Sequence, residues 1–347
     1  MQADIRTLNL DQLKAFFEQH GEKAFRAKQV YEWLWQKSCT SFEAMTNLTL
    51  KTRELLTQHF VLKPVQISDF QVSKDKTIKN AFRLHDGNIV EGVLIPTPTR
   101  MTACISSQVG CSLTCKFCAT GRLDRKRNLD AAEIYDQVVL IRNQAINHYN
   151  IPLSNIVYMG MGEPLLNYRN VLDSIAKITS HQGLGMAPKR ITVSTAGIAK
   201  MIHKLGEDKV NFNLALSLHA ADDAKREKIM PINEQNSLES LADALNSFYQ
   251  NTGSRVTLEY IVFKDFNDSI QDASKLLNFC RKVPSKVNII EYNPIPGGEF
   301  HQTTPERLDD FYNYLVQNKV IVNVRRSRGK DIDAACGQLA NKKGTTT

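Results

Sequence analysis

The feature that most constrains the fold is an alternation of short apolar runs with longer amphipathic stretches, from Met101 almost to the end of the 347-residue chain. The first amphipathic stretch begins at Asp130, a favourable N-cap, with Glu133 placed to complete a capping box. The last begins with Thr304 and Pro305. Repeated strand–helix units predict an α/β fold with a parallel sheet. The predicted strands are Thr102–Ser107, Asn155–Met159, Arg190–Ser194, Asn211–Ser217, Arg255–Phe263, Lys286–Tyr292 and Val320–Arg325.

The residues before Met101 follow two other patterns. The first segment spaces its apolar side chains as helices do and predicts a helical accessory domain. The second contains β-rich runs separated by turn signals and predicts a small linking sheet of Val65–Phe70, Thr77–Leu84 and Asn88–Ile95. The predicted domains are a helical domain at 1–62, a β-rich linker at 63–96, an α/β core at 97–335 and a C-terminal segment at 336–347.

Three cysteines, Cys111, Cys115 and Cys118, are spaced C-x3-C-x2-C in one short run. Three thiolates can hold three corners of a [4Fe–4S] cluster, and no fourth cysteine follows in the run to occupy the last iron. S-adenosylmethionine (SAM), which carries an amino group and a carboxylate on one carbon, suits that iron. Structural zinc usually takes four protein ligands, and disulfide frameworks are typical of short secreted chains. The pattern therefore favours a [4Fe–4S] cluster and SAM over zinc or disulfides.

The composition limits the compartment and the partners. The net charge is +8 and the pI is about 9.0, which favours an anionic partner such as nucleic acid without selecting one. The chain has seven cysteines but no basic start followed by an apolar run, so a secreted protein is not expected. No apolar stretch is long enough to predict a membrane span. We expect a cytoplasmic protein, because thiols stay reduced there.

The wider sequence resembles a known family. The cysteine spacing is that of the radical SAM enzymes. Glu91 in Glu-Gly-Val, the run Ser-Ser-Gln-Val-Gly-Cys ending at Cys111, and Asp-Ala-Ala-Cys-Gly at 333–337 resemble the dual-specificity 23S rRNA and tRNA adenine-C2 methyltransferases. The resemblance covers most of the chain and implies a partial, open (β/α)6 barrel. It also implies methylation at C2 of adenosine 2503 in 23S rRNA and of adenosine 37 in tRNAs.

Polar residues that follow the predicted strands match the SAM contacts of this family. In a parallel sheet the carboxyl ends of the strands meet at one edge, where ligands bind. Taken singly, each position also fits a tight turn, a helix-capping glutamate or a satisfied polar group at a strand end. Together with the cysteine run, they predict a SAM site made of Gly162, Glu163, Ser194, Ser217, Leu218, His219 and Asn293.

The resemblance assigns roles to two further cysteines. The thiolate of Cys336 takes a methyl group from one SAM, giving S-methylcysteine. A second SAM, cleaved by an electron from the cluster, yields a radical that removes hydrogen from this methyl group, and the methylene radical adds to adenine C2. Cys104 then resolves the protein–RNA adduct by forming a transient disulfide with Cys336, and Glu91 is the implied proton acceptor. The cycle needs an electron donor of the flavodoxin type and a thiol reductant.

The substrate must present an unstacked adenine, which single-stranded or loop RNA does at low cost. Two groups of basic residues can be interpreted either as solvated surface charge or as contacts to RNA phosphates. The resemblance favours contacts to RNA. Their residues are Lys14, Lys23, Arg26, Lys28, Lys37, Lys51 and Arg53 in the helical domain, and Arg122, Arg125, Lys126 and Arg127 after the cysteine run. The sequence of the second group differs from the commoner family sequence, so the resemblance does not specify which of its residues contact RNA. We expect the protein to act as a monomer.

Two alternatives remain. One is the related antibiotic-resistance enzyme that methylates adenine C8 with the same cysteines; Pro164 in Gly-Glu-Pro-Leu-Leu-Asn resembles the C2 enzymes better. The other is a non-catalytic iron–sulfur or zinc protein that binds RNA. Such a protein would need neither Cys104 and Cys336 nor a ring of polar groups at the strand ends.

Overall fold

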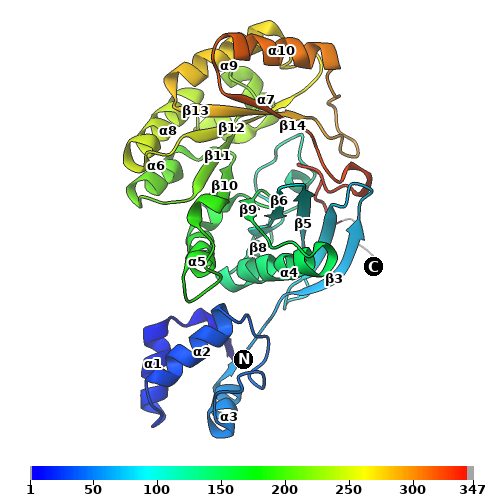
Figure 1. Cartoon of the computed structure of the whole chain (residues 1–347). Helices are drawn as coiled ribbons and strands as arrows, with labels where there is room; N and C mark the ends of the chain where they lie inside the picture. The colour runs from blue at the N-terminus through cyan, green and yellow to red at the C-terminus, as the bar shows by residue number, and fades with distance from the viewer. Residues whose placement is uncertain (1, 342–347) are drawn as a thin grey trace.

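The predicted parallel sheet is confirmed by the computed structural model, which describes residues 2–341. Among these residues, ten strands form one sheet, in the order β14-β13-β12-β11-β10-β9-β6-β5-β4-β3 (Figure 1). Neighbouring strands from β14 to β6 pair in parallel. These seven strands are β6 (Arg100–Cys104), β9 (Asn155–Tyr158), β10 (Ile191–Thr195), β11 (Asn213–Ser217), β12 (Val256–Val262), β13 (Ser285–Glu291) and β14 (Val322–Arg325).

The strand β6 ends earlier than the sequence predicts. Residues after Ile105 leave the ladder because other groups take their backbone bonds. The Ser106 amide donates to the Gln137 side chain at 2.9 Å, and the Ser107 amide donates to the Met161 carbonyl at 2.9 Å. The chain thereby turns out of the sheet and carries the cysteine run to the carboxyl ends of the strands.

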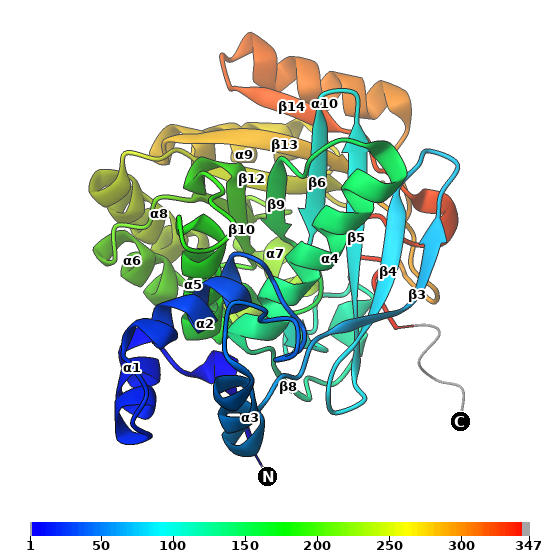
Figure 2. The ribbon, with the colours of Figure 1, turned by 60° about the horizontal axis from the view of Figure 1, so that its bottom comes forward.

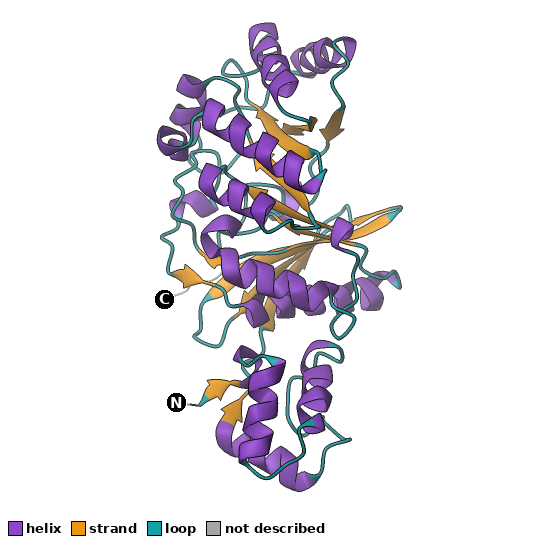
Figure 3. Cartoon of the chain, turned by 90° about the vertical axis from the view of Figure 1, so that its left-hand side faces the viewer, coloured by secondary structure: helices purple, strands orange, loops and turns teal. Residues whose placement is uncertain are grey.

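Helices connect the parallel strands and cover the outer face of the sheet (Figure 3). They are α4 (Ala131–Tyr149), α5 (Tyr168–Thr179), α6 (Ala199–Glu207), α7 (Asp223–Ile229), α8 (Leu238–Thr252), α9 (Ile270–Lys282) and α10 (Pro305–Gln317). The predicted capping box is present, since the Asp130 carboxylate accepts from the Glu133 amide at 2.8 Å and the reciprocal bond is made. No helix in residues 2–341 combines the length and apolar character that crossing a bilayer requires.

The β-rich residues before the core extend the same sheet. Strands β3 (Gln66–Val72), β4 (Ile78–Arg83) and β5 (Ile89–Thr97) pair antiparallel with one another, and β5 pairs antiparallel with β6 (Figure 2). The sequence predicts these strands as a small linking sheet, whereas the ladder between β5 and β6 makes them continuous with the barrel. Two short pairs complete the strands: β1 (Ala3–Asp4) with β2 (Phe60–Val61), and β7 (Gln108–Val109) with β8 (Arg127–Asn128).

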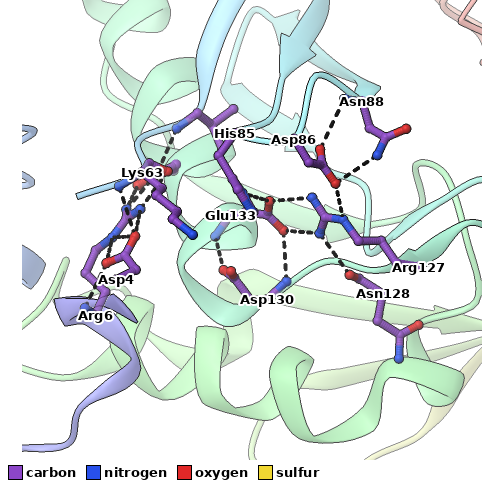
Figure 4. Close-up of polar contacts among 12 residues, drawn as sticks. Asp4, Arg6, Lys63, His85, Asp86, Asn88, Arg127, Asn128, Asp130 and Glu133 are labelled. Carbon is purple, nitrogen blue, oxygen red and sulfur yellow. Dashed lines mark hydrogen bonds and ion pairs between the residues drawn. The ribbon is translucent and has the colours of Figure 1, made fainter. Parts of the chain in front are cut away.

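The N-terminal helices pack beside the start of the barrel. They are α1 (Leu10–Gln19), α2 (Phe25–Trp35) and α3 (Leu50–His59). One Arg6 nitrogen lies 2.8 Å from each carboxylate oxygen of Asp136 in α4. Another lies 2.9 Å from Asp4 (Figure 4). The Tyr135 ring of α4 also packs edge-on against Trp35, with ring centroids 5.1 Å apart. A buried ion pair and an aromatic contact therefore attach the helical domain to α4.

The Arg6–Asp136 pair is expected to make a large contribution to stability. Arg6→Met leaves the Asp136 carboxylate buried without its cation, which should lower the free energy of unfolding by about 3 kcal/mol or more. Urea unfolding followed by circular dichroism measures the loss. The control is Lys14→Met, which breaks an exposed pair with Asp11 and should cost less than about 1 kcal/mol. Equal losses in the two variants would contradict the assignment.

Candidate active site

A cavity lies at the carboxyl ends of the parallel strands, where the sequence predicts the ligands to meet. Its walls come from the cysteine run, from the loops after β9, β10 and β11, and from the C-terminal segment. Nine predicted site residues line it: Cys111, Cys115, Cys118, Gly162, Glu163, Ser194, Ser217, His219 and Cys336. Separate parts of the sequence thus converge on one space.

The three cysteines of the run share this cavity as partly buried thiols. Burial raises the pKa of Cys111 to about 11 and also raises the pKa of Cys115 and Cys118. No group of three described His, Cys, Asp or Glu side chains surrounds a single metal-ion position. Three thiols around a wider common space fit the corners of a [4Fe–4S] cluster, whose irons would stabilise the thiolate forms.

The turn after β9 brings backbone and a carboxylate to the cavity. Gly162 adopts a φ of +95°, and a Cβ on it would lie 2.4 Å from Gln108 Cβ, so a side chain does not fit. Glu163 accepts from the Leu165 amide at 3.0 Å and from the Ala196 amide at 2.7 Å. The first of these bonds confirms the helix-capping interpretation. The second ties this turn to the loop after β10.

Polar groups from the ends of β10 and β11 lie close together, as predicted. The hydroxyl oxygens of Ser194 and Ser217 are 3.4 Å apart. His219 Nδ1 accepts from the Ile261 amide at 3.1 Å, and burial lowers the pKa of His219 to about 3. His219 is therefore neutral, with its proton on Nε2 as a donor. Leu218 does not line the cavity, and its amide donates to the Glu259 carbonyl at 3.0 Å.

Asn293 lies beside the C-terminal segment, outside the cavity lining. Its Nδ2 donates to the Cys336 carbonyl at 3.4 Å, whereas its Oδ1 is buried and accepts no hydrogen bond from a described residue. The Ala119 amide, next to Cys118, donates to the Gly337 carbonyl at 2.7 Å. The start of the C-terminal segment, at Cys336 and Gly337, is therefore held against the cysteine run, and Cys336 is exposed there.

Cys104 is close enough to Cys336 for their charges to interact. Burial, together with the charge of a thiolate at Cys336, raises the pKa of Cys104 to about 12. All seven cysteines lie in the described residues, and none forms a disulfide. The Arg325 guanidinium interacts electrostatically with both thiols and pairs with Glu259 at 3.2 Å. The sequence analysis did not predict Arg325 or Glu259 near these thiols, although Arg325 is a polar residue at a strand end, like the predicted site residues.

Glu91 does not reach the cavity that contains Cys336. One of its carboxylate oxygens pairs with Lys79 Nζ at 3.0 Å, and the other accepts from the Ala340 amide at 2.8 Å. Asn341 Nδ2 donates to the Ile89 carbonyl at 2.6 Å on the same strand. Both oxygens of the predicted proton acceptor therefore have partners, and Ala340 and Asn341 lie against β5.

The basic residues after the cysteine run differ in their contacts. Arg127 donates to both Glu133 oxygens at 2.7 and 2.8 Å and to Asp86 at 2.6 Å, as Figure 4 shows. These bonds give Arg127 a structural role. Arg122, Arg125 and Lys126 are exposed and make mainly backbone or amide contacts, so their contact with RNA remains a prediction.

Comparison with known proteins extends this description. The family model "Ribosomal RNA large subunit methyltransferase N-terminal domain" matches residues 3–62, and "Radical SAM superfamily" matches residues 105–277. A "probable dual-specificity RNA methyltransferase RlmN" of Cytophaga hutchinsonii is 63% identical over 97% of this chain and 93% of its own length. A protein of the same description from Flavobacterium psychrophilum is 56% identical over 98% of each chain.

A solved structure shares the whole fold. The crystal structure of a radical SAM methyltransferase from Sphaerobacter thermophilus aligns with a TM-score of 0.91 and 36% identity. The alignment covers 97% of this chain and 99% of that one. The arrangement of the helical domain and the barrel is therefore similar in the two proteins.

Proposed function

The chain belongs to the RlmN family of radical SAM RNA methyltransferases, and we propose that it methylates C2 of adenosine 2503 in 23S rRNA and of adenosine 37 in tRNAs. The observation that carries the proposal is one cavity that holds both Cys336 and the three cysteines of the run. A methyl-accepting thiol beside a cluster site is what radical transfer to an electron-poor carbon requires.

The donor groups of the cavity fit the proposed cofactors. Cys111, Cys115 and Cys118 would hold the [4Fe–4S] cluster. Glu163, Ser194, Ser217 and His219 would orient SAM, with Gly162 allowing its close approach, and the unpartnered Asn293 Oδ1 offers a further acceptor near the cavity. When bound, these cofactors supply an electron and a SAM-derived radical. The protein supplies binding, orientation and the methyl-carrying sulfur.

The chain's own residues perform the remaining steps. The Cys336 thiolate forms a C–S bond to the methyl group of SAM as the bond from that methyl to the sulfonium sulfur breaks. Once the former methyl carbon is bonded to adenine C2, the protein–RNA adduct gives up one electron to the cofactor site and Glu91 takes the C2 proton. Glu91 lies outside the cavity, so the residues that cover it, Ala340 among them, must move first. The Cys104 thiolate then attacks the sulfur of Cys336, the bond from that sulfur to the methylene carbon breaks, and the carbon takes a proton and stays on the RNA as the methyl group. The disulfide that remains is opened by a thiol reductant. We propose a cytoplasmic monomer with a flavodoxin-like electron donor.

Nucleoside mass spectrometry tests the reaction. Reconstituted protein is incubated anaerobically with SAM, a reductant and either 23S rRNA fragments or tRNA, each taken from cells lacking the activity. We expect 2-methyladenosine in both RNAs. Formation of 8-methyladenosine would refute the C2 assignment but retain the chemistry. Absence of both products from protein with an intact cluster and bound SAM would refute the substrate assignment.

A further inference from the structure

Arg226 is a fully buried arginine in α7 with no carboxylate partner. Its side chain is 0% exposed. Its guanidinium donates to the carbonyls of Leu218 at 3.2 Å, Ser217 at 3.3 Å and Ala196, and to the Asn233 amide oxygen at 2.8 Å. All four acceptors are neutral, and no described carboxylate forms an ion pair with it. The guanidinium therefore has hydrogen-bond acceptors, but its positive charge has no ion-pair partner among the described residues.

An uncompensated charge in a protein interior is costly and calls for an anion nearby. Burial lowers the pKa of Arg226 to about 10, so the guanidinium still carries its charge at neutral pH. The Asp223 carboxylate interacts with it electrostatically, but accepts from the Asn233 amide and forms no ion pair with it. Ala196 and Ser217, whose carbonyls Arg226 binds, both line the cavity that the three cysteines share. The buried cation therefore lies directly behind the wall of that cavity.

The position of Arg226 also links the cysteine run to the SAM side of the cavity. The Lys116 amide donates to the Ile229 carbonyl at the end of α7, at 3.0 Å, which fixes the run against this helix. The carbonyls that Arg226 binds lie at the ends of β10 and β11, next to Ser217 and His219. One guanidinium thus contacts the loops proposed to orient SAM and belongs to the helix that holds the cysteine run in place.

We propose that Arg226 is the buried counter-charge of the cluster and its three thiolates, and that it raises the reduction potential of the cluster. The proposal rests on the proposed [4Fe–4S] site. A cubane of two ferrous and two ferric irons with four sulfides carries +2, so three thiolates make the assembly negative, and an added electron makes it more so. A fixed cation stabilises the reduced form more than the oxidised form, and charge and hydrogen bonding near the cluster set its potential. Arg226 is a positioning residue, since it acts through the cluster.

The test is an anaerobic redox titration of reconstituted protein, monitored by electron paramagnetic resonance, with iron and sulfide content measured alongside. Arg226→Met is expected to shift the midpoint potential to more negative values at equal cluster content. The matched control is Lys225→Met, which removes a neighbouring cation that Asp272 already pairs at 2.6 Å and should leave the potential unchanged. An unchanged potential in cluster-loaded Arg226→Met would overturn the proposal. A wild-type protein that binds no cluster would instead refute the proposed cofactor.

If Arg226→Met loses its cluster, Arg226→Lys tests the counter-charge proposal instead. A buried lysine has a lowered pKa and can lose its proton in the alkaline range. Below that pKa the ammonium supports the reduced cluster; above it the charge is gone and the potential falls. We expect the Arg226→Lys potential to drop with rising pH at a lower pH than the wild-type potential, because a buried ammonium loses its proton before a guanidinium does. If both proteins follow the same pH profile, Arg226 is a structural brace and the counter-charge role is wrong.

Discussion

Replacing Cys336 with alanine is expected to reduce RNA methylation below detection while leaving the cluster and SAM binding intact. Cys336 lies in the same cavity as the cluster cysteines, but it is exposed and outside the C-x3-C-x2-C run. Its side chain is therefore not needed to fold the barrel or to hold iron. The methyl group has no other route to adenine C2, because that carbon is electron-poor and does not attack SAM directly. Nucleoside mass spectrometry gives the product, and iron and sulfide analysis gives the cluster content.

The matched control for this variant is Cys280→Ala. Cys280 is a partly buried thiol in α9 and does not line the cavity that contains Cys336. Cys280→Ala should methylate RNA like the wild type. A Cys336→Ala protein that still forms methylated adenosine would show that the methyl group does not pass through Cys336, and the proposed mechanism would have to be abandoned.

Two substitutions of Glu91 are expected to separate a chemical role from a structural one. Glu91→Gln keeps an oxygen for the Ala340 amide but cannot accept a proton, whereas Glu91→Ala loses both functions. Both should lower RNA methylation by about 100-fold or more, the usual contribution of a general base. Only Glu91→Ala should also slow the methylation of Cys336, by about tenfold, since a hydrogen bond to a charged group is lost from the docked C-terminal segment.

Intact-protein mass spectrometry follows Cys336 methylation without RNA, so it reports the first step alone. Both changes are made in a Lys79→Met background, because Lys79 is buried and would otherwise lose its ion-pair partner. RNA methylation by Glu91→Gln at the rate of that background would show that Glu91 is not the proton acceptor. Equal Cys336 methylation in the two variants would show that the contact with Ala340 does not position the segment.

Features that depend on neighbouring residues were predictable. The seven parallel strands and the capping box at Asp130 were found because strand alternation and helix caps are set within a few residues. The three cysteines proposed to hold the cluster were also predictable together, because they lie close to one another in the sequence. The strand-end rule also placed Ser194, Ser217 and His219 correctly, since parallel strands must deliver their ends to one edge.

Contacts between distant segments were not predictable from the chain alone. Arg127 belongs to a basic run that suggests phosphate binding, but its partners are carboxylates 41 and 6 residues away. Glu91 matches a catalytic motif, yet its partner Ala340 lies 249 residues further along the chain. The sequence around Glu91 contains no signal that Ala340 would contact it in the folded protein.

The amino-acid sequence by itself therefore determined the α/β architecture, the cysteine run and the identity of the candidate site residues, because periodicity, capping and ligand spacing are local properties. Only the tertiary structure decided that β3–β5 extend the barrel sheet, that Ala340 contacts Glu91, and that Arg226 lies buried beside the cavity with no ion pair to a described carboxylate. The physical reason is that burial and pairing of charge depend on which distant groups the folded chain brings within a few ångströms.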